Sequence, residues 1–139
     1  IQKGTRVECP NSDPVAHHVY SFSRPNDFML PLYKGDAHAP VTFEQPGVVT
    51  LGCNIHDSML AYILVVDGSR FGKTDVNGRV SLDVEGMTDG SVTIWSPRIR
   101  QRGEVLTRPV REGAVEFRIK GRLRAAHDSE SGGIEWTDY

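Results

Sequence analysis

The stretch LGCNIHDSMLAYILVV, residues 51–66, places a thiol, an imidazole and a thioether at three-residue steps, on Cys53, His56 and Met59. Thiolate, imidazole and thioether groups are ligands of soft transition metals. The apolar segments on either side are typical of buried strands, so a short loop would carry the motif between them. Three residues do not complete a four-ligand site, and the rest of the site must come from another part of the chain.

A pair of histidines, His17 and His18 in DPVAHHVYSFS, is the best source of a fourth ligand. Two imidazoles, one thiolate and a weak axial thioether form the ligand set of a blue-copper electron-transfer site. Zinc would accept the cysteine and the histidines, but a structural zinc site has little use for Met59. Because neighbouring side chains on a strand point to opposite faces, only one histidine of the pair can reach the metal unless the strand bulges.

The segments that must position these residues have the composition of a β protein. Stretches rich in β-branched and aromatic residues alternate with clusters of Gly, Pro, Asn and Asp, which is typical of strands joined by turns. No stretch has the pattern of a long amphipathic helix, and an Asn-Gly turn signal precedes RVSL. We therefore expect an all-β fold. The expected strands lie within HHVYSFS, VTFEQPGVVTLGC, LAYILVV, RVSLDV, SVTIWS and AVEFRIKGRLR.

Length and composition narrow the classes of protein further. With 139 residues the chain makes one ordinary domain or two small ones. It contains no apolar run of about 18 residues, so we expect no membrane span. Two cysteines are too few for a disulfide scaffold, and we do not expect them to pair. The chain begins at Ile1 without a leader, which we interpret as processing or trimming rather than as information about the compartment.

The net charge of −2 conceals an uneven distribution of charged residues. Residues 98–124 carry 9 basic and 3 acidic groups, whereas residues 125–139 carry 4 acidic groups and no basic ones. The basic segment could bind an acidic partner, but it is more simply a solvated strand face whose charge the tail partly offsets. We expect no nucleic-acid binding, and the sequence leaves the oligomeric state open.

The motif CNIHDSM resembles the ligand loop Cys-x2-His-x2-Met of the cupredoxins, in the short form found in amicyanin. The stretch AHHV resembles the Pro-His-Asn-Val segment that holds the first histidine of those proteins. The longer phrases PNSDPVAHHVYSFS, LPLYKG and PGVVTLGCNIHDSMLAYILVVD are similar to a bacterial subgroup of plastocyanin-like proteins, often labelled methylamine-utilisation proteins. This resemblance covers about residues 1–75 and implies a Greek-key β-sandwich.

The resemblance also implies roles for individual residues. The implied copper ligands are His17, Cys53, His56 and Met59, with the methionine in the weak axial position. His18 falls where cupredoxins have an asparagine that ties the two ligand-bearing segments together, so we expect its side chain to hydrogen-bond to the loop around Asn54. Asn11 and Asp13, in PNSDP, are first turn formers, but their loop could also supply hydrogen bonds beside the site.

The residues after position 70 resemble transthyretin-like or carboxypeptidase-regulatory-like β modules, through a Thr-Asp-x-Asn-Gly turn and a Trp-x-Pro-Arg ending. The plastocyanin-like subgroup often has a histidine where this chain has Ser96. We expect a cupredoxin-like Greek-key β-sandwich at residues 1–69, followed by a smaller β-sandwich-like module at 70–124. Residues 125–139 are expected to form an acidic, flexible tail.

The function implied by the resemblance is one-electron transfer, without enzymatic activity, by a type 1 copper site. His56 would lie nearest solvent and serve as the electron port for a transient redox-protein partner. The alternative is copper handling, meaning scavenging, storage or delivery without electron transfer, which the extra imidazole of His18 favours. A third class is an enzyme with Cys53 as nucleophile and a histidine as base, and a fourth is a scaffold whose metal is only structural. Membership of the cupredoxins implies a periplasmic or otherwise extracytoplasmic location in a bacterium.

The remaining residues with reactive or aromatic side chains have simpler roles. Cys9 follows the alternating stretch TRVEC and is expected to lie in the core. His38 and His127 are expected to be exposed loop residues. Trp95 and Phe71 are expected to form the core of the second half.

Overall fold

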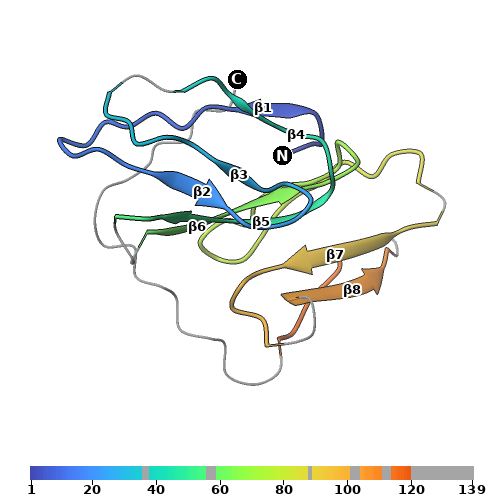
Figure 1. Cartoon of the computed structure of the whole chain (residues 1–139). Helices are drawn as coiled ribbons and strands as arrows, with labels where there is room; N and C mark the ends of the chain where they lie inside the picture. The colour runs from blue at the N-terminus through green and yellow to red at the C-terminus, as the bar shows by residue number, and fades with distance from the viewer. Residues whose placement is uncertain (36–37, 56–58, 88, 101–103, 111–113, 120–139) are drawn as a thin grey trace. The chain divides into compact units, whose positions relative to one another are not determined.

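The structure is a computed structural model that describes residues 1–35, 38–55, 59–87, 89–100, 104–110 and 114–119 (Figure 1). One compact unit contains Ile1–Ser81, and another begins at Leu82. The regular elements within these ranges are β-strands, which confirms the all-β class. In the same ranges, no helix has the length and apolar character needed to cross a membrane.

Six strands in the first unit form two sheets (Figure 1). The larger sheet has the antiparallel order β3-β2-β5-β6, and a separate antiparallel pair joins β1 to β4. The strands are β1 (Thr5–Val7), β2 (Val19–Ser21), β3 (Phe28–Met29), β4 (Val41–Phe43), β5 (Gly47–Cys53) and β6 (Leu60–Val65).

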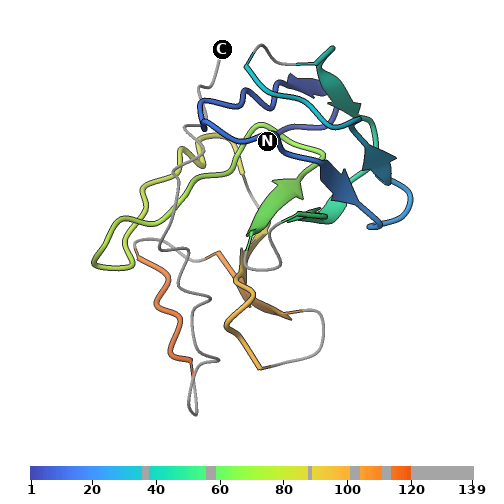
Figure 2. The same ribbon diagram turned by 60° about the vertical axis from the view of Figure 1, so that its left-hand side comes forward.

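A hydrophobic core joins these two sheets into a layered, sandwich-like structure. Alternate residues of β5 and β6 point to one face of the sheet, and those on the buried face pack with Phe43 of β4. The fully or nearly fully buried members are Phe43, Val49, Leu51, Ile63 and Val65. Burial of each such side chain is worth about 1.5–3 kcal/mol. Figure 2 shows the same unit from another side, with the blue and teal strands of residues 1–43 over the green β5–β6 hairpin.

The first residues of the chain connect the two layers. Gln2 forms a parallel bridge with Val66, just after β6, and the amide of Lys3 donates to the carbonyl of Val66 at 2.8 Å. The chain then enters β1 at Thr5, and β1 pairs with β4. The N-terminal segment therefore passes from the edge of the larger sheet to the smaller one.

The unit that begins at Leu82 contains one antiparallel pair, β7 (Ser91–Trp95) and β8 (Val105–Pro109). The expected strand RVSLDV is wrong, because residues 79–84 have no strand partner among the described residues. The carboxylate of Asp75 accepts the amides of Asn77 and Arg79 at 2.9 and 2.8 Å, which closes a local turn instead. Residues 114–119 of AVEFRIKGRLR are likewise outside any strand. Phe71 was expected in a core but is 46% exposed.

The domain limits expected at residues 1–69, 70–124 and 125–139 remain predictions. Residues 120–139 lie outside the described part of the chain, and with them His127 and the expected tail.

Candidate metal centre

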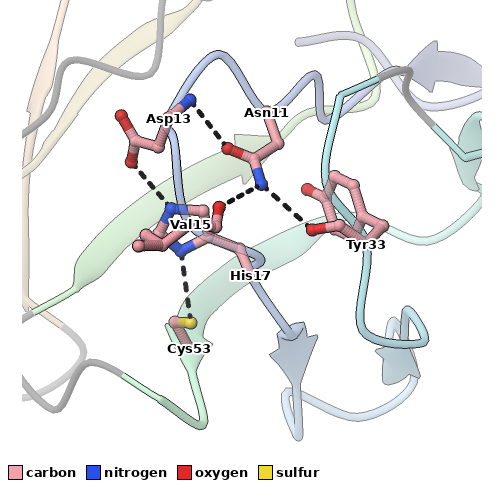
Figure 3. Close-up of polar contacts among 6 residues, drawn as sticks. All are labelled: Asn11, Asp13, Val15, His17, Tyr33 and Cys53. Atoms are coloured by element: carbon pink, nitrogen blue, oxygen red, sulfur yellow. Dashed lines mark hydrogen bonds and ion pairs between the residues drawn. The ribbon is translucent and has the colours of Figure 1, made fainter.

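Strand pairing brings His17 and Cys53 together at one end of the larger sheet. Val19 of β2 lies opposite Cys53, the last residue of β5. His17 is two residues before Val19, so its side chain points to the same face as the side chains of that pair. His17 is 5% exposed and Cys53 is 3% exposed. The Nδ1 atom of His17 lies 3.6 Å from the Sγ atom of Cys53 (Figure 3).

The other ring nitrogen of His17 contacts a carboxylate. Nε2 lies 2.7 Å from Oδ2 of Asp13, as Figure 3 shows. Burial disfavours the charged imidazolium, but the interactions with Cys53 and Asp13 outweigh burial and leave the pKa of His17 raised. The imidazole is therefore held between a thiol and a carboxylate, one on each nitrogen. The sequence predicted Asp13 as a turn former in a loop that could also supply hydrogen bonds beside the site.

Asn11 holds the loop that carries Asp13. This buried side chain donates from Nδ2 to the carbonyls of Val15 and Tyr33, at 2.9 and 3.0 Å. Its Oδ1 accepts the amide N–H of Asp13 at 2.9 Å, an arrangement in which an asparagine side chain closes a turn two residues on. The turn former predicted from PNSDP therefore also supplies hydrogen bonds beside His17.

Tyr33 closes the other side of the histidine segment. The amide of His17 donates to the Tyr33 carbonyl at 2.8 Å, and the Tyr33 amide donates to the His17 carbonyl at 3.0 Å. Burial and the nearby thiols of Cys9 and Cys53 raise the pKa of Tyr33 to about 12, so its phenol is neutral at physiological pH. Tyr33 is not among the site residues predicted from the sequence. Its only signal was its place in LPLYKG, one of the phrases that carry the family resemblance.

His18 points away from Cys53, as the alternation along the strand requires. It is half-buried, and its ring meets the ring of Tyr20 edge-on at a centroid distance of 6.5 Å. Its backbone carbonyl accepts the amide of Asn54 at 3.2 Å. This bond joins the two segments through their backbones, and the side-chain hydrogen bond expected between His18 and the loop around Asn54 remains a prediction.

Tyr20 packs over the strand that ends at Cys53. It lies opposite Gly52 in the register, and a Cβ atom added to that glycine would stand 3.1 Å from Cζ and Oη of the tyrosine. Only glycine therefore leaves the ring in its present place. The ring therefore lies close to the backbone immediately before the thiol.

The structure brings together two of the four expected ligands, His17 and Cys53. Met59 is half-buried and directly precedes β6, and His56 lies outside the described residues. Within the described ranges, no group of three or more His, Cys, Asp or Glu side chains is arranged to hold a metal ion. His56 is outside these ranges, and the thioether of Met59 is not one of these four side-chain types.

Two further reactive side chains lie near Tyr33. Cys9 is buried beside Val19, Leu30 and Tyr33, in the core as expected, and burial raises the pKa of its thiol. His38 is half-buried rather than exposed, because its ring packs edge-on against Tyr33 at 4.8 Å. Its buried Nε2 has no hydrogen-bond partner among the residues that the structure describes.

No family model matches this chain, and neither a curated protein nor a solved structure was found to match it.

Proposed function

We propose that this protein is a type 1 copper protein that transfers single electrons. The observation that carries the proposal is the 3.6 Å separation between Nδ1 of His17 and Sγ of Cys53. With the bond lengths known for zinc, about 2.0 Å to imidazole nitrogen and about 2.3 Å to thiolate, a near-tetrahedral angle leaves the two donor atoms about 3.5 Å apart. The two side chains could therefore bind one metal ion without moving.

The loop after Cys53 can supply the other two ligands. Gly52 pairs with Leu60, so strand pairing holds both ends of the loop together at the end of the β5–β6 hairpin. Three residues of extended chain span at most about 11 Å, which keeps His56 close to the thiol. Met59 immediately precedes Leu60 at the closed end of the loop. The proposed ligands are His17, Cys53, His56 and Met59.

The surroundings of His17 and Cys53 suit an electron-transfer site. Bound copper supplies a couple between its +1 and +2 states. Backbone hydrogen bonds tie His17 to Tyr33 and place Cys53 in a paired strand, so the two ligands keep their separation. Burial of both side chains excludes water, and strands restrict the ligands more than a mobile loop would.

A thiol enzyme is the second candidate, because the same contacts resemble a nucleophile, base and orienting carboxylate. Cys53, His17 and Asp13 are linked in that order at 3.6 and 2.7 Å. A nucleophile must reach its substrate, however, and Cys53 is only 3% exposed. The burial that disfavours this chemistry suits a metal ligand. We therefore place copper binding first and propose no enzymatic activity.

The proposed fold, location and partner accompany the copper site. The layered β structure of the first unit supports a cupredoxin-like Greek-key sandwich. From the family resemblance we propose a location in the bacterial periplasm or elsewhere outside the cytoplasm. We propose that a redox protein docks transiently near His56. Copper scavenging, storage or delivery is the alternative use of the same ligands.

Copper titration followed by voltammetry tests the proposal. We expect one copper ion per chain and a reversible one-electron wave. Binding without a reversible wave would favour copper handling. The Cys9→Ser variant, which leaves Cys53 as the only thiol, tests the enzyme candidate. We expect slow alkylation by iodoacetamide at neutral pH, whereas fast alkylation without copper binding would favour a nucleophilic thiol.

A further inference from the structure

We propose that Asp13 is a positioning residue that fixes the tautomer of His17 before any metal binds. This inference rests on the proposed copper site, because it assigns Asp13 a role toward one of its ligands. In the metal-free protein Asp13 would hold the proton on Nε2 and leave the lone pair of Nδ1 facing Cys53.

The first argument is the geometry of the two contacts. A carboxylate can only accept hydrogen bonds, so the 2.7 Å contact with Oδ2 of Asp13 requires a proton on Nε2 of His17. A neutral imidazole has one N–H, and Nδ1 then carries a lone pair. That lone pair lies on the side of the ring that faces Sγ of Cys53 at 3.6 Å. The opposite tautomer would place two acceptors against each other at 2.7 Å.

A series of hydrogen bonds through Asn11 and Tyr33 also links the segments that carry Asp13 and His17 (Figure 3). The Asp13 amide donates to Asn11, and Asn11 donates to the carbonyl of Tyr33. Tyr33 is in turn bonded through its backbone to His17. These bonds tie the loop that carries Asp13 to the segment that carries His17, which keeps the carboxylate within reach of the imidazole.

The difference in burial between the two side chains indicates that Asp13 orients His17, and not the reverse. The His17 side chain is 6% exposed, whereas the Asp13 side chain is 40% exposed. The buried ring has few alternative partners, but the carboxylate can be replaced without leaving a large cavity. In known metal sites, a carboxylate that accepts the remote N–H of a ligating histidine fixes the orientation of the ring and raises its basicity. The loss of such a partner typically weakens metal binding about 10-fold to 100-fold.

The experiment measures the tautomer directly in the copper-free, reduced protein. Nitrogen-15 NMR of the imidazole, at a pH where His17 is neutral, distinguishes the protonated from the unprotonated ring nitrogen. We expect the Nε2–H form to exceed the Nδ1–H form by at least about tenfold in the unsubstituted protein, the ratio set by one charge-assisted hydrogen bond. Asp13→Ala should lower that ratio, and Asp13→Asn should lower it as well, because an amide can also turn its NH2 group toward Nε2.

Asp27→Asn is the matched control, since Asp27 is an exposed acidic residue of the same unit. This variant should leave both the tautomer ratio and the copper affinity unchanged, whereas Asp13→Ala should weaken copper binding about 10-fold to 100-fold. A proton on Nδ1 in the unsubstituted protein, or a ratio that Asp13→Ala leaves unaltered, would overturn the inference while leaving the copper site standing. The expected ratio in a protein that binds no copper would support the role of Asp13 and refute the proposed function.

Discussion

The substitution Asn11→Ala should destabilise the first unit by about 3 kcal/mol. Asn11 is 7% exposed and makes three side-chain hydrogen bonds, to the carbonyls of Val15 and Tyr33 and from the amide of Asp13. A typical intramolecular hydrogen bond contributes about 1 kcal/mol net, and a buried group left without a partner costs about 1–3 kcal/mol. The bond to Tyr33 is fully buried, so water cannot replace it. Three bonds therefore give the expected loss of about 3 kcal/mol.

Amide hydrogen exchange at β5 and β6 measures this loss within the first unit, independently of the rest of the chain. A change of about 3 kcal/mol accelerates exchange through global opening of the unit about 150-fold. Asn26→Ala is the control, because Asn26 makes one exposed bond, from Nδ2 to the Gln45 carbonyl at 2.7 Å. Its effect should stay within about 0.5 kcal/mol. Equal protection of β5 and β6 in the two variants would refute the role of Asn11 as the brace of this loop.

Three further predictions concern the site and its support. His17→Ala should abolish the coloured copper site while His18→Asn keeps it, and visible spectra with the opposite result would mean that the two histidines had been assigned the wrong way round. Met59→Leu should keep copper and raise the reduction potential, since the weak axial thioether stabilises the oxidised ion. A lower potential, measured by voltammetry, would contradict this role of Met59. Gly52→Ala should destabilise the unit by about 1–3 kcal/mol because the added Cβ overpacks the neighbouring tyrosine ring. Urea denaturation compares it with Gly68→Ala, whose added Cβ has only one atom, at 4.0 Å, in reach; equal stability of the two would contradict the packing argument.

The sequence predicted that only one of the two histidines would face the thiol, and the family resemblance selected His17. Alternation along a strand separates His17 from His18, and the structure buries the first and turns the second away from Cys53. The position of Cys53 at the end of a strand was predictable because the apolar run of β5 stops at the motif. These features depend on local periodicity, which a single sequence carries.

The contacts of Asp13 and Tyr33 were not predictable in the same way. The carboxylate of Asp13 reaches His17 only because the Asn11 side chain closes a turn, and periodicity does not describe turns. Tyr33 is brought to His17 by pairing across a loop, which depends on the tertiary fold. The same limit explains the failed prediction at residues 79–84, where an alternating pattern exists but no partner strand lies beside it in the described residues.

The visible spectrum of the copper(II)-loaded protein tests the central claim most directly. Cys9 and Cys53 are both buried, so Cys9→Ser is a matched control for Cys53→Ser. An intense band from charge transfer between thiolate and metal should form in the unsubstituted protein and in Cys9→Ser, and should be absent from Cys53→Ser. Absence of the band from the unsubstituted protein, or its persistence in Cys53→Ser, would contradict a blue-copper site built on Cys53.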